Sequence, residues 1–156
     1  MNAMGNKPFL IGIIAEPYEV TSRIPPKPVS EAEIMRSYCD SRGGILTYMY
    51  SSLDGITLRA NAKVPRIIAE NEEFFIPGKY TKVSGKVKTS GGEAFVRSDP
   101  EGNLLVVFVN NGASPLKCKA VFPGKGNVID CISGKTVSAA EKSVPSGGIA
   151  VFRQNR

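Results

Sequence analysis

The chain has 156 residues, enough for one ordinary domain or two small ones, and its 42% hydrophobic and 22% charged content is typical of a globular protein. No apolar run approaches the roughly 20 residues that a membrane helix needs, so we expect no membrane protein. The formal charge is +6, and the chain contains no histidine. The missing histidine excludes Ser-His-Asp and Cys-His catalysis and histidine metal sites, which leaves carboxylates, Tyr, Lys and Cys for any chemistry.

The N-terminal segment MNAMGNK lacks the charged start and the long apolar region of a signal peptide. A second methionine, Met4, suggests that residues 1–5 are a cloning remnant. Without a visible signal peptide, a cytoplasmic location is favoured.

The first predicted element is a strand from Phe9 to Ala15. Its residues are apolar on both faces, which is typical of a buried parallel strand. The apolar run ends at a carboxylate, Glu16, which is followed by Pro17. A stiff Pro-rich loop, SRIPPKPV, comes next and is too long for a hairpin turn.

A helix is then predicted from local signals. Ser30 is the expected N-cap, Glu33 completes a capping box, and Val29 and Ile34 occupy the two positions of a hydrophobic staple. Gly43 or Gly44 is expected to end the helix. One apolar stripe is formed by Ile34, Met35, Tyr38 and Cys39, so we interpret Cys39 as a core residue and not as a nucleophile.

A second buried-type strand is predicted at 44–50, with sequence GILTYMY, followed by the polar loop SSLDG. From Asn61 or Val64 to Phe75 the apolar spacing predicts a second helix, with Pro65 in its first turn. The order strand, helix, strand, helix indicates a parallel βαβα unit.

After Pro77 the pattern changes to short strands separated by turns. The strand-like runs are EAFVRSD, NLLVVFVNN, LKCKAVF, NVIDCIS and GIAVFRQ, which predict an antiparallel sandwich or barrel. We therefore predict an α+β fold in which a βαβα segment, residues 6–78, precedes an antiparallel β-sandwich, residues 79–156.

The turn Pro123 to Gly126 predicts a hairpin in which Cys118 lies opposite Cys131. A disulfide between them is geometrically conceivable, but without a secretion signal we expect two reduced, buried thiols. The three cysteines have no CxxC spacing, so no zinc site is expected, and we predict neither a metal nor a cofactor.

Two surface functions are weighed against simpler interpretations. The basic cluster Lys79, Lys82, Lys86 and Lys88 has the spacing to follow phosphates, although a solvated strand edge is the favoured interpretation and no nucleic-acid partner is expected. The chain has no Trp, and its phenylalanines beyond Pro77 lie in strand runs that should be core. A carbohydrate-binding surface on the β part therefore has weak support.

The order of features resembles the C-terminal end of clan A glycoside hydrolases, most closely the β-galactosidases of family 42. The residues that carry this resemblance are FLIGIIAEPYE, the Pro-rich loop, PVSEAEIMRSYCDSRGGILTYMYSS and a terminal β domain containing SDPEGNLLVVFVNNG and VIDCISGKTV. The resemblance implies the last two βα units of a TIM-type barrel followed by a β-sandwich, and carbohydrate as the partner of the parent enzyme. It also implies that Glu16 is the nucleophile of a retaining enzyme and that Tyr18, Tyr48, Tyr50 and Asp54 bind substrate.

A retaining glycosidase needs a second carboxyl group about 5 Å from the nucleophile, normally from an Asn-Glu pair at the end of the fourth barrel strand. The only Asn-Glu pair here, Asn71-Glu72, falls in the predicted second helix and cannot serve. We therefore expect a glycoside-hydrolase-like fragment that is inactive alone and that associates with other copies through exposed strand edges.

Two alternatives remain open. One is a non-catalytic β-sandwich module that binds carbohydrate or another protein. The other is a basic β-barrel that binds nucleic acid, which draws on the net charge of +6.

Overall fold

The computed structural model describes residues 10–14, 29–40, 44–48, 55–76, 78–83 and 85–155, with the backbone alone for 10–14 and 44–48. Its helices are α1 (Glu31–Asp40), α2 (Gly55–Ala69) and a short 3₁₀ helix, η1 (Glu72–Phe74). Its strands are β1 (Leu10–Ile14), β2 (Gly44–Tyr48), β3 (Thr81–Lys82), β4 (Lys88–Ser90), β5 (Glu93–Ser98), β6 (Leu104–Val109), β7 (Leu116–Val121), β8 (Asn127–Asp130), β9 (Lys135–Val137), β10 (Ala140–Val144) and β11 (Ile149–Asn155). Within the described part of the chain, neither long helix has the length and apolarity to cross a bilayer.

The structure confirms the parallel βαβα unit. β1 and β2 pair in parallel from Leu10 opposite Gly44 to Ile14 opposite Tyr48, and α1 lies between them in the chain. The order and direction of the two strands agree with the sequence pattern, and the predicted strand positions 9, 15, 49 and 50 lie outside the described residues.

The described residues from 81 to 155 form the predicted antiparallel sandwich. One sheet has six strands in the order β3-β5-β6-β11-β8-β9, and the other has three in the order β10-β7-β4. All six residues of β6 are buried, because one face of the strand packs against the helices and the other against the three-stranded sheet. The α+β fold is therefore confirmed.

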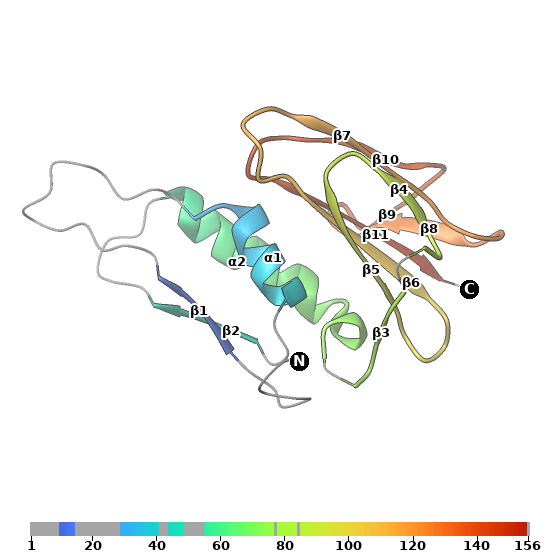
Figure 1. Ribbon diagram of the computed structural model, residues 1–156, viewed down its shortest axis with the longest axis horizontal. Helices are drawn as coiled ribbons and strands as arrows, with labels where there is room; N and C mark the ends of the chain where they lie inside the picture. The colour runs from blue at the N-terminus through green and yellow to red at the C-terminus, as the bar shows by residue number, and fades with distance from the viewer. Residues whose placement is uncertain are drawn as a thin grey trace, which may run out of the picture.

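The helices form a layer between the parallel pair and the six-stranded sheet (Figure 1). Val64 and Ile67 of α2 and Met35 of α1 are completely buried in one cluster with Leu105 and Val107 of β6. Burying an aliphatic side chain of this size contributes about 1.5–3 kcal/mol, so this shared core is a main source of the attachment between helices and sandwich.

The predicted start of α1 is confirmed in detail. The Ser30 N–H donates to the Glu33 carboxylate at 2.8 Å, and the Glu33 N–H donates to the Ser30 hydroxyl oxygen at 3.2 Å. Val29 and Ile34 are both buried, as a hydrophobic staple requires. Cys39 is fully buried, which agrees with its interpretation as a core residue.

The prediction for the second helix was wrong at both ends. α2 begins at Gly55 and ends at Ala69, so Pro65 lies inside the helix and not in its first turn. The helix continues past this proline because Val64 and Ile67, on either side of it, are anchored in the core. Residues 72–74 then form η1.

The predicted hairpin between Cys118 and Cys131 was also wrong. β7 pairs with β10 and β4, whereas β8 pairs with β11 and β9, so the turn at Pro123 to Gly126 crosses from one sheet to the other. Cys118 lies in the core between the two sheets, and Cys131 lies in the core beneath the helices. Both are free thiols, as expected, and they stay apart because they lie in different cores.

The basic cluster lies on solvated edges, as favoured from the sequence. Lys82 is on β3 and Lys88 is on β4, which are edge strands of different sheets, and both side chains are exposed. Short edge strands that carry lysine are poor templates for pairing with another chain.

Candidate functional site

The predicted catalytic and substrate-binding residues lie mostly outside the described part of the chain. Glu16, Tyr18, Tyr50 and Asp54 are not among the described residues, and only the backbone of Tyr48 is. Tyr48 is the last residue of β2 and pairs with Ile14, which stands two positions before Glu16 in the sequence. The assignment of Glu16 as a nucleophile therefore stays a prediction.

The Asn71-Glu72 pair has a structural role. Asn71 is 2% exposed, and its side chain donates to the Ile67 carbonyl at 2.8 Å at the end of α2. Its side-chain oxygen accepts a hydrogen bond from Arg153 of β11 at 3.2 Å, which ties the helix end to the six-stranded sheet. Glu72 is exposed, and its carboxylate lies 3.8 Å from the Lys79 ammonium group. The pair was predicted to fall in the second helix, but it lies after α2, with Glu72 as the first residue of η1.

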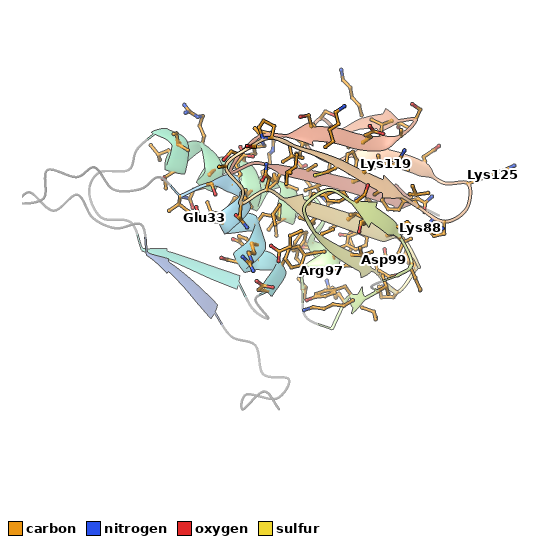
Figure 2. The ribbon with its side chains drawn as sticks, turned by 45° about the horizontal axis from the view of Figure 1, so that its top comes forward. Glu33, Lys88, Arg97, Asp99, Lys119 and Lys125 are labelled. Atoms are coloured by element: carbon orange, nitrogen blue, oxygen red, sulfur yellow. The ribbon has the colours of Figure 1, made fainter. Side chains whose placement is uncertain are left out.

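Arg97 of β5 is the most buried charged residue in the described part of the chain, at 1% exposure. Its guanidinium group donates to the carbonyl oxygens of Cys39 and Phe74, both at 2.6 Å, so it binds the end of α1 and the end of η1 together. It also lies 4.8 Å from the Phe75 ring centroid and 4.3 Å from that of Tyr80. Figure 2 shows Arg97 where the helices meet the sandwich.

The sequence analysis missed Arg97, although a signal was present. Arg97 has the same parity along β5 as Phe95, which packs into the core beneath the helices. Side chains alternate between the two faces of a strand, so Arg97 shares a face with Phe95. A cation at such a position is either buried with a partner or marks the end of the buried face.

Asn110 is a second buried residue that holds separate segments together, and the sequence analysis did not single it out. It is fully buried at the end of β6, and its side-chain nitrogen lies within 3.0 Å of the carbonyl oxygens of Ser114, Val144 and Pro145. Its side-chain oxygen accepts a hydrogen bond from the Gly112 N–H at 2.9 Å. Asn110 therefore fixes both the turn after β6 and the end of β10.

The three cysteines are poor nucleophiles. Burial raises the pKa of Cys39 to about 12 and that of Cys131 to about 11, and it also raises the pKa of Cys118. The thiolate is the reactive form of cysteine, so these groups are inert in the folded protein at neutral pH.

A groove of about 800 Å³ lies between α2 and β10, and we call it the α2–β10 groove. Its volume falls within the range of about 300–1,000 Å³ that is usual for ligand sites. Its cations are Arg59, Lys63 and Arg66 of α2 and Lys142 of β10, and its apolar floor includes Ala62, Ile132, Pro145 and Ile149.

The charges in the groove are only partly balanced. Lys63 contacts Glu31 at 2.7 Å, and Lys142 contacts Asp130 at 2.8 Å. Burial of Asp130 opposes its ionisation, but hydrogen bonds from Lys142 and the Ile132 N–H outweigh this effect and lower its pKa. Glu31 is the one acidic residue among the described residues that line the groove, against four cations.

The N-terminus of α1, at one end of the groove, is not open to an anion. The Ala32 N–H donates to the Gly147 carbonyl at 2.9 Å, and the Glu33 N–H is taken by the Ser30 cap. The binding capacity of the groove therefore comes from its side chains. No group of three or more potential metal ligands occurs among the residues that the structure describes.

No protein-family model matches the chain, and no curated protein matches it significantly. Among solved structures, the β-galactosidase from Bacillus circulans sp. alkalophilus is similar over 70% of this chain, with 19% identity and a TM-score of 0.31. The chain spans 14% of the length of that structure. A similarity of this size establishes neither the family nor a barrel fragment.

Proposed function

We propose that this chain is the terminal part of a glycoside-hydrolase-like protein, in which β1 and β2 belong to a catalytic (β/α)₈ barrel of the family 42 kind and the sandwich is an accessory unit. The order of layers carries the proposal: a parallel strand pair, then two helices, then the sandwich (Figure 1). In a β/α barrel the parallel strands form the inner wall and the helices the outer ring, so an accessory unit contacts the helices.

The parallel pair supports the proposal in a second way. Parallel strands normally occur in larger sheets that are covered on both faces, and two strands alone are marginal in water. No described element covers the face of β1 and β2 that points away from the helices (Figure 1). Further barrel strands would cover this face.

In the whole protein, Glu16 would attack the anomeric carbon and form a glycosyl-enzyme intermediate, which water then hydrolyses. Tyr18, Tyr48, Tyr50 and Asp54 would surround the sugar. The acid that protonates the leaving group would come from another part of the barrel, because Asn71 ties the helix end to the sandwich and Glu72 lies on the surface beside Lys79. Carbohydrate would thus be a partner of the whole protein and not of this chain alone.

The first test measures hydrolysis of aryl glycosides by the purified chain. We expect no turnover above that of a Glu16→Gln variant. Hydrolysis that Glu16→Gln abolishes would show that the chain is an active enzyme by itself and would overturn this part of the proposal.

The second test extends the chain with whatever coding sequence precedes it and measures the same hydrolysis. Glu16→Ala should abolish activity, and added azide should restore it by attacking the anomeric carbon in place of the missing carboxylate. Tyr18→Phe is the matched control, because it leaves the nucleophile in place and should need no azide. An extended protein in which Glu16→Ala retains full activity would refute the nucleophile assignment.

Of the alternative functions, carbohydrate binding by the sandwich has little support. Phe108 and Phe152 are buried between the sheets, and Tyr80 lies against Arg97, so these three rings are not exposed platforms for sugar stacking. A protein-interaction role has a specific feature in its favour, namely the α2–β10 groove.

A further inference from the structure

We propose that the α2–β10 groove binds an extended acidic segment of a partner polypeptide. Carboxylates of the segment lie over the cations of α2, and its apolar side chains lie on the aliphatic floor. This interaction goes beyond the proposed glycosidase role and depends neither on Glu16 nor on the barrel.

The cations of α2 form one continuous row. Arg59, Lys63 and Arg66 follow one another at intervals of four and three residues, which places them on the same face of the helix. Seven residues of helix rise about 10 Å, and an extended peptide rises about 3.3 Å per residue. Two carboxylates separated by one residue, about 7 Å apart, therefore fit within the row.

Arg59 is the strongest part of this argument. Its side chain is exposed, and the described residues offer it no ion pair. Arg66 contacts Glu70 at 3.8 Å, but both side chains are more than half exposed, and pairs of this kind are weak and exchange readily. Both guanidinium groups can thus accept a carboxylate in the bidentate geometry that arginine favours.

The floor distinguishes a peptide from other anions. The described residues that line the groove include no aromatic ring, whereas sugars and single-stranded nucleic acids are usually held by stacking on such rings. The exposed Ile56 and Ala62 and the half-buried Ile132 instead offer an aliphatic surface for the side chains of a polypeptide.

Lys142 makes pairing with a second copy unfavourable. β10 is an edge strand, and Lys142 lies at its centre with the same parity as Ala140 and Val144, which face the core. An inward-pointing charge on an edge strand opposes the addition of another strand. The occupant therefore binds through its side chains, and on the opposite wall Lys142 is 36% exposed and holds its ammonium group 2.8 Å from the Asp130 carboxylate.

The test uses the full chain and a fluorescein-labelled nonapeptide of alternating Glu and Val, with fluorescence anisotropy as the readout. The Glu peptide should bind about tenfold more tightly than a peptide with Gln in place of every Glu, and its affinity should fall as salt rises from 50 to 300 mM. The double variant Arg59→Ala, Arg66→Ala should weaken binding by about tenfold. Ala62→Trp, which fills the groove at an exposed helix position, should weaken it by at least as much.

The matched control is Lys117→Ala, Lys119→Ala. These two lysines are exposed on the outer face of β7, and Figure 2 shows Lys119 on the sandwich away from the helices. The control removes the same net charge and should change the affinity by less than about twofold. Equal losses in the two double variants would mean that only net charge matters, and equal binding of the Gln peptide would mean that charge does not matter; either result would overturn the proposal.

Two further outcomes would assign the groove to another occupant and would also overturn the proposal. One is self-association of the chain, measured by sedimentation, that Ala62→Trp abolishes. The other is binding of a neutral oligosaccharide that the same substitution abolishes. Neither result bears on aryl-glycoside turnover or on azide rescue at Glu16, so failure of this inference is distinguishable from failure of the proposed function.

Discussion

Replacing Arg97 should separate the helix layer from the sandwich. Its two hydrogen bonds of 2.6 Å reach the carbonyls of Cys39 and Phe74, which belong to different helices, and its guanidinium group contacts two aromatic rings. A hydrogen bond from a charged donor contributes about 1.5–3 kcal/mol, and each cation–π contact contributes about 0.5–1 kcal/mol or more when desolvated. This one side chain therefore supports a large part of the attachment.

Arg97→Lys keeps the charge but loses the planar fork. A lysine ammonium can reach one of the two carbonyls and cannot stack on Phe75 and Tyr80 as a flat group, so we expect a loss of about 2–4 kcal/mol in the free energy of unfolding. Arg97→Met loses both hydrogen bonds and leaves two buried carbonyls without a donor, for a loss of about 3–6 kcal/mol. Total stabilities are about 5–15 kcal/mol, so Arg97→Lys is the variant to purify first.

The measurement is urea unfolding followed by far-UV circular dichroism. Arg36→Lys is the matched control, because Arg36 is 50% exposed between Asp40 and Glu93 and should change the free energy by less than about 0.5 kcal/mol. If Arg97→Lys is as stable as the control with an unchanged urea dependence, the reasoning from the two carbonyls is wrong.

Three further predictions concern the thiols, Asp130 and Asn110. At pH 8 the native protein should bind no thiol reagent, because burial raises the pKa values of its thiols, whereas the unfolded chain should bind three equivalents. Rapid labelling of the native protein would contradict this prediction. The folded-state pKa of Asp130 is lowered, so its carboxylate contributes stability above about pH 4, and this stability is lost as the pH falls through the folded pKa. Asp130→Asn should therefore make the melting temperature less sensitive to acid. An unchanged pH profile would refute the lowered pKa of Asp130. Asn110→Ala should lower the free energy of unfolding in urea by about 2–3 kcal/mol, because several buried backbone groups lose their partner. Replacement of the exposed neighbour, Asn111→Ala, should be nearly neutral. Equal losses in the two variants would contradict the structural role of Asn110.

The elements that could be predicted from the sequence are those whose signals are local. The start of α1 depends on hydrogen bonds between Ser30 and Glu33, three residues apart, and the capping box can be read directly. β6 could be predicted because it is apolar on both faces, which follows from its place between two cores. β10 was missed because its sequence, AEKSV, consists largely of residues with low strand propensity, although its buried ends alternate as a strand requires.

The errors arose where the outcome depends on distant residues. The turn Pro123 to Gly126 is compatible with a hairpin, but β8 pairs with β11, and a Cβ at Gly126 would lie 2.6 Å from the Asn155 carbonyl oxygen at the end of that strand. The alternation along β5 indicates that Arg97 is buried, but it binds carbonyls that are 58 and 23 positions away in the chain, so no local pattern identifies its partners. Most of the predicted catalytic site lies outside the described residues, and its assignment depends on the resemblance alone.

Peptide binding and the attachment of the helices should be coupled, because the walls of the α2–β10 groove come from both layers. Arg59 and Arg66 stand on the helix layer, whereas Lys142 and Ile149 stand on the sandwich. A peptide that contacts both walls binds only while the layers are docked, and at one hundred times its dissociation constant it would stabilise that state by about 2.7 kcal/mol. Arg97 is not among the described residues that line the groove, yet Arg97→Lys should weaken peptide binding by loosening the layers, and saturating peptide should recover part of the lost stability. A variant that loses stability but binds the peptide as tightly as the parent chain would show that the groove belongs to one layer alone.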